Sequence, residues 1–126
     1  MSSIDQKSAE FEENGYFILP KLVAPAEAEE IFSQIEEVVD IALAAKGYTE
    51  SDSLSLDEKY SMLEEKFPAL KSHVYDVFGY LDSVRTAFLQ PIIREIGRSI
   101  FGTALLIDHI QIRADSYRND RVLPLH

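Results

Sequence analysis

Apolar side chains recur every three or four positions between Pro25 and Ala45, and acidic side chains occupy many of the positions between them. The apolar positions are Ala28, Ile31, Phe32, Ile35, Val38, Val39 and Ala42. This spacing predicts an amphipathic helix, because residues three and four apart share one face of a helix. Pro25 suits the first turn of such a helix and Gly47 suits its end, so the pattern also predicts the boundaries.

Helices are also expected on both sides of this long one. Residues 4–13 form a short amphipathic segment that ends close to Gly15, where glycine can adopt the positive φ of a helix stop. Ser55 and Glu58 have the spacing of a capping box, which predicts a helix that begins there and ends near Pro68.

A further apolar stripe predicts one continuous helix over residues 70–88. Its apolar positions are Leu70, Val74, Val77, Leu81, Val84 and Phe88. Gly79 weakens the middle of this helix by up to about 1 kcal/mol relative to alanine. Pro91 interrupts the stripe and opens another helix, which stops at Gly102.

Two stretches have the pattern of strands instead. Residues 16–19 are a short aromatic and aliphatic run that Pro20 closes, and residues 103–114 are rich in β-branched side chains and alternate in polarity. One face of the second stretch turns from apolar to polar along its length, as it would on leaving a core for solvent or for a ligand cavity. With so few strands to pair, backbone groups stay open, so self-association through unpaired strand edges is expected.

The composition is that of one ordinary domain with a real core. The chain has 126 residues, of which 46% are hydrophobic, and no cysteine, which excludes disulfides, thiolate metal sites and cysteine nucleophiles. Its formal net charge of −10 argues against nucleic acid and anionic membranes as partners, because both are bound largely through Lys and Arg. Neither a secretory signal nor a long apolar span is recognisable, so a cytoplasmic location is expected.

Negative charge is concentrated in the first half of the chain. Residues 1–66 hold 16 acidic and 5 basic side chains (net −11), and residues 67–126 hold 6 and 7 (net +1), which sum to −10. We interpret the acidic side chains as solvated outer faces of helices. The arginines of the second half are scattered, which favours a carboxylate or phosphate of a small ligand over a polyanion. They are Arg85, Arg94, Arg98, Arg113, Arg118 and Arg121.

The two ends of the chain carry motifs that resemble one enzyme family. FEENGYFILP at residues 11–20, followed by the helix at Pro25, resembles the opening of the phytanoyl-CoA dioxygenase family of non-haem Fe(II), 2-oxoglutarate-dependent oxygenases. DHIQIR at residues 108–113, followed by LPLH at residues 123–126, resembles the strand and loop that lead into the His-x-Asp iron motif of that family. The motifs stand in the order and at the separation that the family has.

The resemblance implies an α+β fold in which residues 1–126 form a single unit. Residues 1–102 would be the helical support of an oxygenase domain. Residues 103–126 would supply the strand and loop into the metal site, as the first part of an incomplete double-stranded β-helix of the jelly-roll or cupin type.

The resemblance also assigns roles to individual residues. His126 matches the first iron ligand of a triad of two histidines and one carboxylate, a set that suits Fe(II). Arg113 matches a position where many relatives place a lysine that helps to hold 2-oxoglutarate, and Gln111 lies on the same face of the expected strand. His73 and His109 are expected to be ordinary histidines rather than ligands.

The other two iron ligands and the basic residue that clamps 2-oxoglutarate are not among the 126 residues. Fe(II) and 2-oxoglutarate are therefore implied for the full-length relative and are not expected to bind this chain alone. The chain is expected to be the N-terminal part of a hydroxylase of a small organic substrate and to be inactive by itself. The alternative is a self-sufficient, acidic and mainly helical binding or scaffold domain without catalysis.

Overall fold

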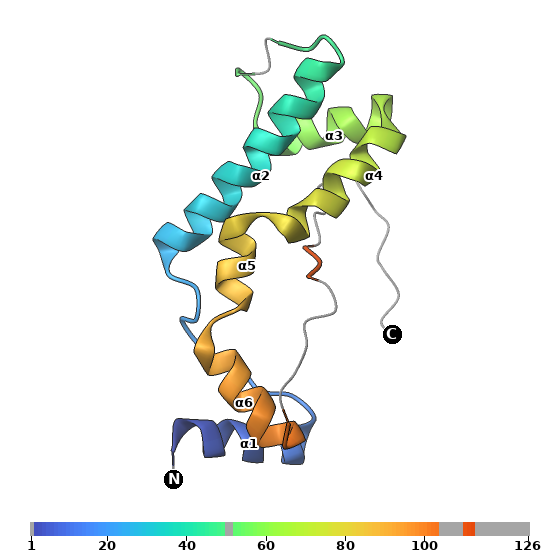
Figure 1. The fold of residues 1–126 in the computed structure, drawn as a ribbon. Coiled ribbons are helices and arrows are strands. Elements are labelled where there is room, and N and C mark those ends of the chain that lie inside the picture. The colour runs from blue at the N-terminus through green and yellow to red at the C-terminus, as the bar shows by residue number, and fades with distance from the viewer. Residues whose placement is uncertain (1, 50–51, 104–109, 113–126) are drawn as a thin grey trace.

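The computed structural model describes residues 2–49, 52–103 and 110–112, and these residues fold into helices joined by short connections (Figure 1). The elements are α1 (Ser3–Asn14), α2 (Pro25–Ala45), α3 (Leu56–Lys66), α4 (Pro68–Val77), the 3-10 turn η1 (Phe78–Tyr80), α5 (Asp82–Phe88) and α6 (Pro91–Phe101). Figure 1 shows α1 crossing α6 at the end of the molecule opposite α3 and α4.

Most of the helices expected from the sequence are confirmed, because their end signals are local. Pro25 begins α2, and Gly102 ends α6 with a left-handed φ of 69°. At the start of α3, the Glu58 backbone N–H donates to the Ser55 hydroxyl at 3.3 Å, and the Ser55 N–H donates to the Glu58 carboxylate at 2.8 Å. Both backbone donors of this capping box are thereby satisfied.

The single helix expected over residues 70–88 is wrong. The chain leaves α4 through η1, and Leu81 is extended, with φ −63° and ψ 137°, before α5 begins. The stripe does not form one buried face: Val74 and Val84 are buried, whereas Val77 is 42% and Phe88 48% exposed. The spacing of apolar residues alone does not predict such a change of chain direction.

The expected α+β fold, with the first strands of a double-stranded β-helix, is also wrong for the described residues, which contain no strand. Residues 16–19 belong to no helix or strand and pair with no other described segment. Of the expected strand over residues 103–114, Thr103 and residues 110–112 are not in a strand, and residues 104–109 and 113–114 lie outside the described residues. A strand needs a hydrogen-bonded neighbour, which side-chain alternation cannot supply.

The main core lies where α2, α3 and α4 meet. Its buried members are Val39, Ala42, Leu43, Tyr60, Leu63, Val74 and Phe78. Phe78 is central, with ring centroids 6.2 Å from Tyr60 and 6.3 Å from Tyr75. At the other end, α1 packs against α6, and Ser8 donates a hydrogen bond to Ser99 at 2.6 Å, but α1 has no fully buried residue. We call the α2–α3–α4 end, where seven side chains are buried in one cluster, the dense end.

Candidate functional site

The structure locates one of the three candidate site residues. Gln111 is exposed and lies between the half-buried Ile110 and Ile112. Arg113 and His126 lie outside the described residues, so their expected roles stay predictions.

The described residues do not fit an iron site. Within residues 2–49, 52–103 and 110–112, no group of three or more His, Cys, Asp or Glu side chains could hold a metal ion. His73 is exposed on α4, and His109 lies outside the described part. Because the implied triad needs three ligands on one face of the metal, the described residues do not hold a complete triad.

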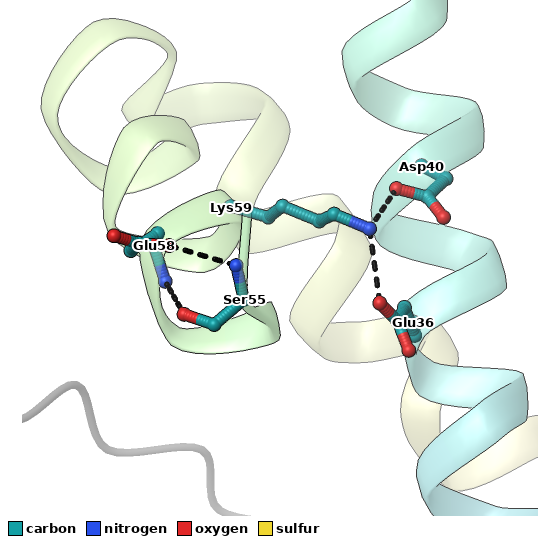
Figure 2. Close-up of polar contacts among 5 residues, drawn as sticks. All are labelled: Glu36, Asp40, Ser55, Glu58 and Lys59. Carbon is teal, nitrogen blue, oxygen red and sulfur yellow. Dashed lines mark hydrogen bonds and ion pairs between the residues drawn. The ribbon is translucent and has the colours of Figure 1, made fainter. Parts of the chain in front are cut away.

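The most tightly organised polar group lies between α2 and α3 (Figure 2). The ammonium of Lys59 donates to the Asp40 carboxylate at 2.8 Å and to the Glu36 carboxylate at 2.9 Å. The Lys59 side chain is 3% exposed, whereas the Glu36 and Asp40 side chains are 37% and 39% exposed. Burying a lysine is costly unless it is paired, and two carboxylates one turn apart on α2 provide that pairing.

The chemistry of this group of Lys59, Glu36 and Asp40 indicates a structural role rather than a catalytic one. Hydrogen bonding to Asp40, followed by hydrogen bonding to Glu36, raises the pKa of Lys59 above its ordinary 10.5, and burial only partly opposes this. A lysine held as the ammonium ion is neither a nucleophile nor a base. Lys59 therefore ties α3 to α2.

The sequence did not predict this ion-paired group, because the acidic residues of α2 were interpreted as pointing away from the core. Glu36 and Asp40 instead flank the apolar stripe on the side that meets α3. The available signal was the pair of acids four residues apart beside Val39, together with a lysine, Lys59, next to the apolar stripe of α3.

A second polar feature places lysines over aromatic rings around the α3–α4 junction. The Lys66 ammonium lies 4.9 Å from the ring centroid of Tyr48, and the Lys46 ammonium lies 5.5 Å from that of Phe67. The rings of Tyr48 and Phe67 meet edge to face at 5.9 Å. Such contacts order lysine side chains at a surface, but they bring no nucleophile or general base together.

A small hollow lies on the outer side of α3. It measures about 220 Å³ and is lined by Leu54, Glu58, Met62, Glu65 and Lys66. Ligand sites usually enclose about 300–1,000 Å³. The Glu58 carboxylate already accepts the capping bond of Ser55. This hollow is therefore smaller than most ligand sites.

No helix within the described part is both long enough and apolar enough to span a membrane. Comparisons with protein-family models, with curated proteins and with solved structures found no match. The function must therefore be inferred from this chain's own residues.

Proposed function

We propose that this chain is the helical N-terminal part of an Fe(II)- and 2-oxoglutarate-dependent oxygenase similar to the phytanoyl-CoA dioxygenase family, and that the 126 residues alone are inactive. The observation that carries the proposal is the pair of motifs, FEENGYFILP at residues 11–20 and DHIQIR with LPLH at residues 108–113 and 123–126. The reaction class is hydroxylation of a C–H bond of a small organic molecule by O2, coupled to conversion of 2-oxoglutarate to succinate and CO2.

The local structure around the first motif is consistent with this proposal. α1 is capped at Gly15, residues 16–19 follow without helix or strand, and α2 begins at Pro25. Phe17 packs against Phe11 with ring centroids 6.3 Å apart, so the aromatic residues of the motif hold the connection against α1.

Large apolar side chains left exposed also support the proposal. They occur on residues 16–18, on the first half of α2, on α5 and on α6. Tyr16, Ile18, Phe32, Phe88 and Phe101 are each at least 48% exposed. Soluble domains rarely leave many such side chains uncovered unless another surface packs on them. A helical support for a larger catalytic part would have apolar surface of this kind.

The DNA sequence that follows the codon for His126 tests the proposal most directly. We expect the reading frame to continue with any residue, then Asp, and later a distal His and an Arg. A frame that stops, or that lacks the Asp, would contradict the assignment.

Succinate formation provides the biochemical test. The 126-residue chain with Fe(II), 2-oxoglutarate and a panel of small organic substrates should form no succinate, because it lacks the remaining ligands. The chain extended by its downstream residues should form succinate, and His126→Ala should abolish that turnover. Turnover by the 126 residues alone would contradict the proposal that they are inactive.

A second candidate is an acidic helical binding domain. It is favoured by the exposed carboxylates along α2, namely Glu27, Glu29, Glu30 and Glu37. Such a domain would be monodisperse, would melt cooperatively and would bind no Fe(II). Aggregation or ready oligomerisation of the purified chain would favour the oxygenase proposal, because uncovered apolar surface promotes association.

A further inference from the structure

We propose that Gly79 is a positioning residue that docks the segment Ile110–Ile112 against the helices. Docking at this point would set how that segment presents Gln111. The docking itself is independent of the proposed function, whereas the consequence for 2-oxoglutarate rests on it. We call the space beside the Gly79 Cα, which the Ile110 backbone occupies, the Gly79 notch.

The Gly79 notch admits only a residue without a Cβ. A Cβ placed on Gly79 would lie 3.0 Å from the carbonyl carbon of Ile110 and closer still to its carbonyl oxygen. Gly79 is buried in η1, and Figure 1 shows residues 110–112, drawn in red, beside the bend between α4 and α5. The obstacle is backbone rather than a flexible side chain, so it cannot rotate away.

Side chains hold the segment at a second point. Ile112 packs against the main core cluster, and Ile110 and Ile112 are half-buried while Gln111 between them is exposed. A slip of one residue at the notch would therefore move Ile112 away from the core cluster.

Close approach explains this glycine better than backbone conformation does. The glycines with positive φ in the described residues are Gly15, Gly47 and Gly102, and Gly79 is not among them. Alanine is the better helix former, so it would suit the local helical turn if no neighbour were present. What alanine would lose is the contact with Ile110.

An introduced thiol measures the docking in the full chain, which has no cysteine of its own. Ile112→Cys should react slowly with a small disulfide reagent while the segment is docked. Adding Gly79→Ala should raise this rate at least about tenfold, because the segment then opens more often. An unchanged rate, with the helical circular dichroism intact, would overturn the proposal.

Two matched controls isolate the notch. Ser53→Cys, exposed in the loop before α3, should react equally fast with or without Gly79→Ala. Tyr80→Ala, at the 72% exposed neighbour in η1, should leave the reaction rate of the Ile112→Cys thiol unchanged. A rise with Tyr80→Ala equal to that with Gly79→Ala would mean that any disturbance of the turn opens the segment, and would contradict the proposal.

A rescue experiment covers the case in which Gly79→Ala fails to fold. Residues 110–112 are then replaced by Gly-Ser-Gly, which has no isoleucine side chains to hold the segment against Gly79. Recovery of the helical signal in the Gly79→Ala chain supports the notch, and continued failure overturns it.

The consequence for 2-oxoglutarate has its own measurement. In the chain extended by its downstream residues, Gly79→Ala should raise the KM for 2-oxoglutarate more than it lowers kcat. The thiol and rescue measurements use no iron, 2-oxoglutarate or substrate. Failure of the docking and failure of the oxygenase assignment are therefore distinguishable.

Discussion

The two ends of this helical chain are held together in different ways. At the α2–α3–α4 end, seven buried side chains form one cluster, and a buried lysine joins two helices. At the α1–α6 end, α1 buries none of its residues fully, and Phe101 stays 60% exposed although its ring lies 6.3 Å from that of Phe11. The first end has a cluster of fully buried side chains, whereas at the second end α6 buries only Ile96 and Gly97.

The largest expected effect comes from the dense end. Phe78→Ala removes a fully buried ring that contacts Tyr60 and Tyr75, and it should lower the free energy of unfolding by about 3–5 kcal/mol. Phe101→Ala is the matched change at the other end, and should cost under about 1 kcal/mol. Urea unfolding followed by circular dichroism measures both. Equal losses would show that the two ends do not differ in packing.

Loss of the ion pairs of the buried Lys59 should cause the second-largest decrease in unfolding free energy. Glu36→Gln together with Asp40→Asn leaves the Lys59 ammonium buried without an anionic partner, which should cost about 2 kcal/mol in unfolding free energy. Glu37→Gln, an exposed neighbour on α2, is the control and should change stability by less than about 0.5 kcal/mol. A double variant as stable as this control would show that the ion pairs are not needed at the α2–α3 contact.

Alkaline pH should also remove the stability that the ion pairs of Lys59 provide. Because Asp40 and then Glu36 raise the pKa of Lys59 above 10.5 in the folded chain, the pairing stabilises fully below that value. The stabilisation is lost as the pH rises through the higher, folded-state pKa. The unfolding free energy of the wild type relative to Lys59→Met should therefore fall as the pH rises above about 10.5. A difference that stays constant would contradict the raised pKa.

The helix caps extend the comparison to local structure. Ser55→Ala removes the cap of α3, which belongs to the dense end, and should cost about 1 kcal/mol in global stability. Ser2→Ala removes the equivalent capping box of α1, where the Ser2 hydroxyl accepts from the Asp5 N–H at 3.1 Å. We expect Ser2→Ala to speed amide exchange in α1 and to leave the global transition almost unchanged. A comparable global loss from Ser2→Ala would mean that α1 unfolds together with the core.

The sequence predicted those helix boundaries that depend on residues close by in the chain. The start of α3 at Ser55 and the end of α6 at Gly102 follow from side chains within a turn of the boundary, and both were predicted correctly. The break at η1 depends on Phe78 entering the core and on Ile110 approaching Gly79, contacts that no local pattern contains.

Contacts between residues far apart in the chain also explain why the strand expected at residues 16–19 is absent from the described residues and why the Lys59 ion pairs were not predicted. Residues 16–19 have strand-like side chains but no strand beside them in the described part of the chain, and the Lys59 pairing depends on how α2 meets α3. Of the candidate site, the structure places Gln111, which is exposed and does not lie in the expected strand. The roles expected for Arg113 and His126 come from resemblance to a family.

The smallest expected change in unfolding free energy comes from a surface contact at the dense end. It tests whether surface contacts there contribute to stability. Lys66 contacts Tyr48 in two ways: its ammonium lies 4.9 Å from the ring centroid and donates a hydrogen bond to the hydroxyl at 3.3 Å. Exposed contacts between a cation and a ring are worth about 0.5–1 kcal/mol, so Lys66→Gln should cost about 0.5 kcal/mol in urea unfolding. Tyr48→Phe keeps the ring and removes the hydroxyl, and should cost less, because that hydrogen bond competes with water. If Tyr48→Phe costs as much as Lys66→Gln, the hydrogen bond rather than the ring holds the lysine. If Lys66→Gln costs as much as loss of the Lys59 pairing, stability at this end comes from its surface as much as from its core, and the contrast between the two ends needs a different explanation.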